Sequence, residues 1–214
     1  MGKMNYGPFG PFTGKIGKLV GSSRNGVFYV KTISKRTAPF SEAELANHNR
    51  FRVAEAWVKP LLSFVKVGFN NDTPNRGRSA AKSYIMKNAI ESEGLEVTVF
   101  PERMKVSMGN LSLSENISVA VDEDLNLHFS WNKDYVTNGS MRDQIMMLAY
   151  DVDAKRAYSV TAGNFRYLGT DVLPIDSKSY ERTLHIYAAF NAENRKDQSE
   201  SVYLGTIIIQ KSDA

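Results

Sequence analysis

The stretch LNLHFSW at residues 125–131 decides the fold that we expect for the C-terminal part of the chain. Apolar residues stand at every second position and alternate with Asn126, His128 and Ser130, so this period of two predicts a strand with one face in a core. Eight further segments with strand character lie between turn residues, at 96–100, 105–108, 117–121, 144–151, 157–160, 164–168, 183–190 and 202–209. Short strands at such regular spacing predict an antiparallel β-sandwich.

The first part of the chain has a different character. Residues 7–30, GPFGPFTGKIGKLVGSSRNGVFYV, contain six glycines and two short runs of strand-forming residues. We expect strands at 16–20 and 27–33, joined through 21–26, with Asn25-Gly26 in the tight turn because both residues tolerate positive φ. The glycines lack the spacing of a phosphate-binding loop or a dinucleotide fingerprint, so we assign them to turns and close backbone approach.

Two helices are expected between this hairpin and the sandwich. Ser41 and Glu44 have the spacing of a capping box at the start of the first helix. Its apolar face is predicted to carry Leu45, Phe51, Ala54, Val58, Leu61 and Val65. Pro60 predicts a kink, or a new short helix that uses this proline as its first residue. The second helix is expected at about residues 78–90, with Gly94 ending it.

No catalytic, metal or cofactor site is predicted. The chain has no cysteine, and the spacing of His48, His128 and His185 is not that of metal ligands. Residues 122–126 begin like a calcium loop, but Leu127 stands where the turn glycine is needed. No G-x-S-x-G motif presents a serine nucleophile. A pair of carboxylates for glycoside hydrolysis would come from distant strands, and this alternative stays open. We therefore expect a protein that is not an enzyme.

Nothing in the sequence predicts a membrane protein. The start MGKMNYGPFGPF lacks the apolar segment of a signal peptide, and no run reaches the roughly 20 apolar residues that span a bilayer. We expect a cytoplasmic protein with no membrane partner, and non-classical release stays open.

Several segments resemble known proteins. The block Gly10-x-Phe12-x-Gly14-Lys15-x-Gly17-x-x-Val20-Gly21, with the segment at 40–45, resembles an uncharacterised bacterial family that is known only as a domain of unknown function. Residues 125–131, 146–150 and 184–190 resemble the central strands of fibronectin type III and immunoglobulin-like sandwiches. Residues 38–57 resemble a helical segment of proteins from phage and prophage gene clusters. These resemblances imply no activity and no site residues.

The sequence thus predicts an α+β fold: an N-terminal β-hairpin plus two helices, followed by an antiparallel immunoglobulin-like β-sandwich. Charge divides the chain at Gly94. Residues 1–94 carry 15 basic and 6 acidic side chains, a net charge of +9, whereas residues 95–214 carry 12 and 17, a net charge of −5. We predict a basic glycine-rich hairpin and helical region at 1–94 and a β-sandwich domain at 95–214. Opposite charges favour head-to-tail association or an anionic partner.

Three functions agree with these features. We favour a non-catalytic structural or interaction protein, as in an assembly module of a phage-like or mobile-element particle, which binds a protein partner or itself and uses Phe28 and Tyr29. The second is nucleic-acid or anion binding by the basic residues of the N-terminal third. These residues are Lys15, Lys18, Arg24, Lys31, Lys35, Arg36, Arg50 and Arg52. The third is a carbohydrate-binding or hydrolytic site on the sandwich.

Overall fold

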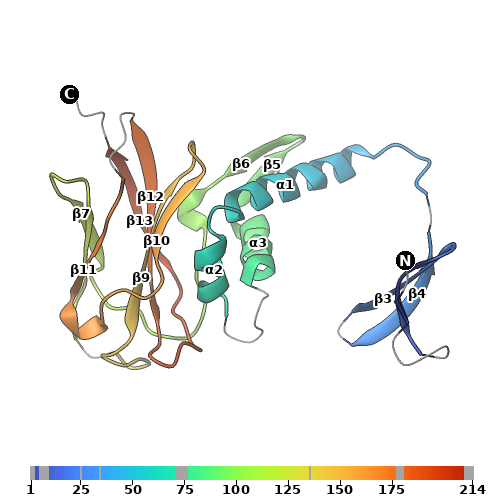
Figure 1. Ribbon diagram of the computed structural model, residues 1–214. Helices are drawn as coiled ribbons and strands as arrows, with labels where there is room; N and C mark the ends of the chain where they lie inside the picture. The colour runs from blue at the N-terminus through green and yellow to red at the C-terminus, as the bar shows by residue number, and fades with distance from the viewer. Residues whose placement is uncertain are drawn as a thin grey trace. The chain divides into compact units, whose positions relative to one another are not determined.

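The computed structural model describes residues 3–4, 10–24, 26–33, 35–70, 77–134, 136–176 and 181–209 (Figure 1). The chain forms two compact units, Met1–Ser41 and Glu42–Ala214. In the part of the chain that is described, helices combine with antiparallel strands in several sheets, so the fold is α+β as predicted. The compact units divide the chain at a different place from Gly94, because that boundary follows charge and the units follow packing.

The N-terminal unit is a four-stranded antiparallel sheet in which the strands follow their order in the sequence. It consists of β1 (Lys3–Met4), β2 (Phe12–Ile16), β3 (Leu19–Arg24) and β4 (Val27–Thr32). Gly26 turns the chain before β4 with a φ of 81°, while Asn25, the other residue of the predicted turn, lies outside the described residues. The strand predicted at 16–20 is wrong, because Gly17 has a φ of 59° and turns the chain between β2 and β3. The predicted connection at 21–26 contains the end of β3.

Three helices open the larger unit, among the residues that the structure describes. They are α1 (Glu42–Val58), α2 (Leu62–Gly68) and α3 (Gly77–Asn88). The first begins directly after Ser41, where the capping box placed it. Pro60 separates α1 from α2, which begins two residues later and not at the proline. Ala54 and Val58 are buried as predicted, but Leu45 and Phe51 are exposed because burial along α1 begins only in its second half.

Gly94 does not end a helix, contrary to the prediction. After α3 the chain enters a hairpin of β5 (Ile90–Glu93) and β6 (Glu96–Val99), and Gly94 lies in its turn with a φ of 60°. A positive φ suits both a helix end and a tight turn, so the glycine alone does not distinguish them.

Two further sheets contain the remaining strands. One has the order β10-β9-β12-β13, formed by Arg156–Val160, Gln144–Asp151, Arg182–Asn191 and Val202–Ile209. The other has the order β11-β8-β7, formed by Thr170–Leu173, Leu127–Ser130 and Ser118–Val121. No strand forms at 105–108, and residues 166–168 form a 3-10 turn, so two predicted strands are wrong and β11 was missed.

Strand β9 places side chains in two different cores. Met146, Leu148 and Tyr150 pack with the buried residues of the helices, while Ile145, Met147 and Ala149 pack with those of the three-stranded sheet. This arrangement follows from the period of two in a strand. The four-stranded sheet is therefore a middle layer, with α1, α2 and α3 over one face and β11-β8-β7 over the other (Figure 1).

Aromatic residues join the helical layer to the middle sheet. The ring of Trp57 in α1 lies 5.2 Å from that of Tyr150 in β9, and Tyr187 in β12 lies 5.2 Å from Tyr203 in β13. The Tyr187 hydroxyl donates a hydrogen bond of 2.8 Å to the carbonyl oxygen of Pro101. Burial raises the pKa of Tyr150 to about 12 and also raises that of Tyr187, so both phenols are neutral at physiological pH.

His185 lies at the edge of this cluster and favours its neutral form. Its Nδ1 is 3.0 Å from the Tyr203 hydroxyl, and its ring centroid is 6.2 Å from that of Trp57. Burial lowers the pKa of His185, although Glu102 and Asp153 partly oppose this shift. Protonation therefore costs more in the folded chain than in the unfolded one.

A buried ion pair joins three loops near one end of the sheets. The Arg166 Nη2 lies 3.2 Å from the Asp143 Oδ2, and the two side chains are 0% and 2% exposed. Arg166 also donates hydrogen bonds to the Ser114 hydroxyl at 2.8 Å and to the Ser112 carbonyl oxygen at 2.9 Å. Its guanidinium lies 4.0 Å from the Phe190 ring centroid. One side chain thus holds loops that are distant in sequence.

The Asp143→Ala variant is expected to lose about 3–5 kcal/mol of unfolding free energy, because the Arg166 guanidinium would be left buried without its charge partner. Chemical denaturation measures this loss. Arg142→Ala is the matched control, since its ion pair with Glu193 is exposed and should contribute less than about 1 kcal/mol. Equal losses in the two variants would contradict this role of the buried pair.

His185 should make stability depend on pH as the pH falls below its unfolded-state pKa of 6.5. The pKa of this side chain is 6.5 in the unfolded chain and lower in the folded protein. The unfolded state then binds more protons as the pH falls below 6.5, and the unfolding free energy decreases. Denaturation at several pH values should show a shallower slope for His185→Gln than for the exposed control His48→Gln. Identical slopes would exclude His185 as the cause.

Candidate functional site

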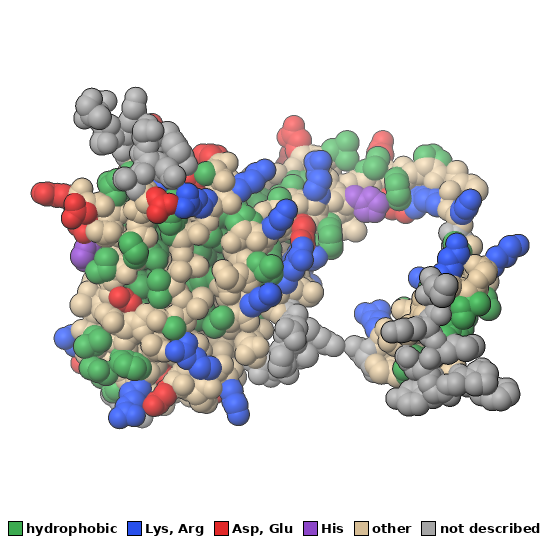
Figure 2. All heavy atoms as spheres, in the orientation of Figure 1, with side chains coloured by type: hydrophobic (Ala, Val, Ile, Leu, Met, Phe, Trp, Pro, Cys, Tyr) green, Lys and Arg blue, Asp and Glu red, His purple; other side chains and the backbone are tan. Residues whose placement is uncertain are grey.

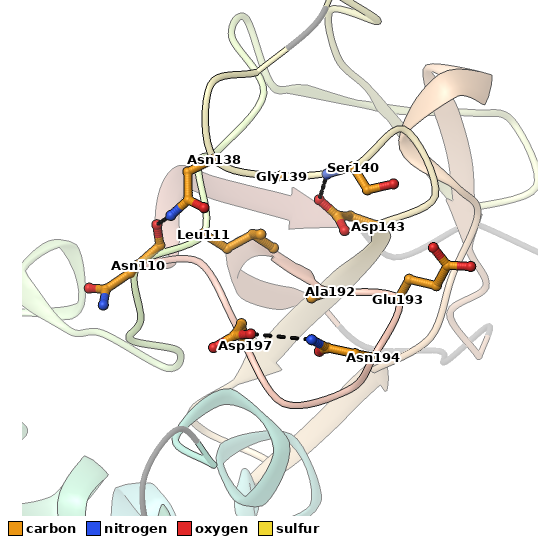
Figure 3. Close-up of a pocket in the computed structure, with 10 residues that line it drawn as sticks. All are labelled: Asn110, Leu111, Asn138, Gly139, Ser140, Asp143, Ala192, Glu193, Asn194 and Asp197. Carbon is orange, nitrogen blue, oxygen red and sulfur yellow. Dashed lines mark hydrogen bonds between the residues drawn. The ribbon is translucent and has the colours of Figure 1, made fainter.

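The larger unit has an open cleft of about 590 Å³ between loops (Figure 3). The lining residues come from 110–111, 138–143 and 192–197, and the last of these segments connects β12 to β13. The Asn138 amide donates to the Asn110 carbonyl oxygen at 2.5 Å, and the Ser140 N–H donates to the Asp143 Oδ2 at 2.7 Å. These bonds shape the cleft from polar loop residues.

The carboxylates of this cleft all have partners. Asp143 binds the buried Arg166, Glu193 lies 3.4 Å from Arg142, and Asp197 accepts a bond of 3.4 Å from the Asn194 amide. None of the described lining residues is aromatic, so the cleft offers hydrogen bonds but no stacking platform for a sugar ring. Across the described residues, no group of three or more His, Asp or Glu side chains is arranged to hold a metal ion.

The N-terminal sheet has a different character, because almost all of it is exposed. Gly21 is the only buried residue among those described between 10 and 41. Every residue of β4 is exposed, and Val27 and Val30 reach 68% and 55%. Strand β4 is also the last strand of its sheet, so one of its edges has no neighbouring strand in the sheet. Open apolar faces and unpaired edges are typical of interaction surfaces.

Register gives this sheet two unlike faces. Residues that pair across antiparallel strands share a face, and neighbours along a strand point to opposite faces. Leu19 pairs with Ile16 and Thr32, Gly21 pairs with Val30, and Ser23 pairs with Phe28. The Phe12 ring joins this side, because a Cβ at Gly21 would collide with it. We call this side the apolar face: its apolar side chains are Phe12, Ile16, Leu19, Phe28 and Val30, and Ser23 and Thr32 lie among them.

The opposite side, which we call the basic face, consists of Lys15, Val20, Arg24, Val27, Tyr29 and Lys31. Val20 pairs with both Lys15 and Lys31, so these lysines lie in one row across three strands. Arg24 pairs with Val27, and Ser22 pairs with Tyr29. Lysine and arginine side chains and hydrophobic side chains are both visible at the surface of this unit (Figure 2).

The structure brings together only part of the basic set predicted from the sequence. Lys15, Arg24 and Lys31 share the basic face, whereas Lys18 lies in the turn between β2 and β3. Lys35 follows β4 and is exposed.

The three remaining arginines make local contacts. Arg36 donates to the carbonyl oxygens of Ala38 and Pro39 at 2.8 and 2.9 Å. Arg50 and Arg52 belong to α1 in the larger unit. Arg50 donates to the Met86 carbonyl oxygen at 2.6 Å and so joins α1 to α3, while Arg52 donates to the Asn49 side chain at 2.7 Å.

The predicted aromatic pair is divided between the two faces. Phe28 lies on the apolar face and Tyr29 on the basic face, as expected for adjacent residues of a strand. Phe12, Ile16, Leu19 and Val30 were missed as surface residues. The sequence shows that these residues share a side only if the turn is placed at Gly17-Lys18. The prediction of a strand at 16–20 was incompatible with that turn.

Charge strengthens the contrast between the units. Residues 1–41 contain five Lys, two Arg and no Asp or Glu, a formal charge of +7. Residues 42–214 contain 20 basic and 23 acidic side chains, a formal charge of −3. The cations of the N-terminal sheet therefore have no acidic side chain within their own unit. Among the described residues, no helix combines the length and the hydropathy needed to cross a membrane.

The comparisons with known proteins agree with the resemblance seen in the N-terminal block. No curated protein and no solved structure matches the chain. A family of unknown function, DUF6266, matches residues 11–205 and so includes strands of the N-terminal sheet, the helices and both larger sheets. The match confirms the expectation of a domain of unknown function. The chain therefore belongs to the DUF6266 family.

Proposed function

We propose that this protein is a non-catalytic structural module that associates with a second copy of itself through the apolar face of the N-terminal sheet. The exposure of that face carries the proposal: Phe28 is 47% and Val30 55% exposed, and Ile16 and Leu19 are also exposed. A small sheet needs a hydrophobic face packed against another layer for stability. In the described part of the N-terminal unit no such layer is present.

A second copy suits this face for two reasons. The same apolar patch is present on every chain, so two copies can stack about a two-fold axis with identical surfaces in contact. Face-to-face stacking also leaves the basic faces, with Lys15 and Lys31, on the outer sides of the pair. The basic faces of the two copies are then separated by the thickness of both sheets, and the repulsion between their like charges is reduced.

We further propose that the strands from β7 to β13 form an immunoglobulin-like sandwich of the fibronectin type III kind. Named A, B, C, C′, E, F and G in chain order, they form the sheets E-B-A and C′-C-F-G, and both sheets contribute to one core. Nuclear Overhauser contacts from β8 to β11 and from β9 to β12 would test this strand order. The proposed role in a phage-like or mobile-element particle is supported by the resemblance of residues 38–57.

Replacing Phe28 and Val30 together by serine should weaken self-association at least about ten-fold, because two exposed apolar side chains leave the contact surface. Light scattering coupled to size-exclusion chromatography, with the full-length chain over a range of concentrations, measures the change. Val27→Ser is the control, since Val27 lies on the opposite face of the same strand. A chain that is monomeric at all concentrations contradicts the proposal.

A further inference from the structure

We infer that the basic face of the N-terminal sheet binds single-stranded nucleic acid, with its lysines and arginine on phosphates and Tyr29 stacked on a base. This inference goes beyond self-association and uses the opposite face of the sheet. It begins from the absence of any Asp or Glu in residues 1–41, which leaves the cations of this face without an acidic partner in their own unit.

The register places one aromatic ring among these cations. Lys31 is two residues from Tyr29 on β4, and therefore lies on the same face. Arg24 lies on the adjacent strand β3, two residues from Ser22, the partner of Tyr29. Lys15 completes the row that passes through Val20 to Lys31. Cations thus lie on more than one side of the exposed Tyr29 ring.

This pattern suits a single strand better than a duplex. Proteins that bind single strands combine a positively charged track for the backbone with aromatic rings on which bases stack. A base is available for stacking in a single strand, whereas in a duplex it is already stacked between its neighbours. The face is part of an open sheet and Tyr29 is 42% exposed, so a base can reach the ring.

Two other anionic partners share part of this chemistry. An anionic membrane would attract the same lysines but would not require stacking on Tyr29. The larger unit of another copy carries a formal charge of −3 and is a weaker attractor than a nucleic-acid backbone with one charge for each nucleotide. Dependence of binding on the Tyr29 ring therefore distinguishes a nucleic acid from the other anionic partners.

The test uses fluorescence anisotropy with the full-length protein and a labelled ten-nucleotide oligothymidylate. Three phosphate contacts predict a slope of log K against log salt of about −2, which corresponds to a roughly 20-fold loss of affinity between 50 and 200 mM salt. A matching duplex should bind more weakly. Absence of binding at 50 mM salt, a flat salt response or tighter binding of the duplex would overturn the inference.

Substitutions locate the site. Tyr29→Ala should weaken binding of the oligothymidylate by roughly 5- to 150-fold, the range expected for loss of one stacked base. Lys15→Gln with Lys31→Gln should weaken it and reduce the salt slope, and Lys15→Arg with Lys31→Arg should restore both. The control is Lys87→Gln with Lys155→Gln, which removes the same charge from exposed positions of the larger unit. An equal effect of the two glutamine pairs would overturn the assignment.

A second probe excludes the other anionic partners. Vesicles of phosphatidylcholine with one-third phosphatidylserine should compete weakly with the oligothymidylate, and any binding to them should be unchanged by Tyr29→Ala. Stronger binding to vesicles than to the oligothymidylate would overturn the inference in favour of a membrane surface. Because Phe28→Ser with Val30→Ser changes only the apolar face, loss of self-association with retained Tyr29-dependent binding would show that the two faces act separately.

Discussion

Burial of both faces of the sheet β10-β9-β12-β13 is the constraint on which the larger unit depends. Its central strand β9 directs alternate side chains into two cores, one shared with α1, α2 and α3 and one shared with β11-β8-β7. Loss of either outer layer would expose one face of the middle sheet to water. Each apolar Å² exposed in this way would cost about 25 cal/mol. The same constraint explains why the QIMMLAYD segment at 144–151 is apolar at consecutive positions and not only at every second one.

The N-terminal unit has no such core, and its chemistry therefore lies on its surface. Two turns at Gly17 and Gly26 fold one glycine-rich segment into strands whose opposite faces differ, one apolar and one basic. The two proposals use these faces without competition. Stacking of apolar faces would leave two basic faces pointing outwards, and a polyanion could then contact both copies.

Local signals predicted much of the secondary structure. The start of α1, the turn at Gly26 and the strands β9, β12 and β13 follow from capping, turn chemistry and periodicity. Local signals were insufficient where one residue type serves two purposes. Gly94 suits a helix end or a hairpin turn. Residues 164–168 have the composition of a strand, but 166–168 form a 3-10 turn that presents Arg166 to Asp143. An ion pair between loops 23 residues apart has no local pattern.

By itself, the sequence determined the α+β class, the segregation of charge, the family and the alternation of side chains along each strand. Only the tertiary structure decided which layer each side chain meets, because that depends on elements that are distant in the chain. It placed Arg50 on the Met86 carbonyl oxygen and not on the basic face, and it brought the Phe12 ring of β2 against Gly21 of β3. Periodicity gives the direction of a side chain relative to its own strand, while packing determines what lies in that direction.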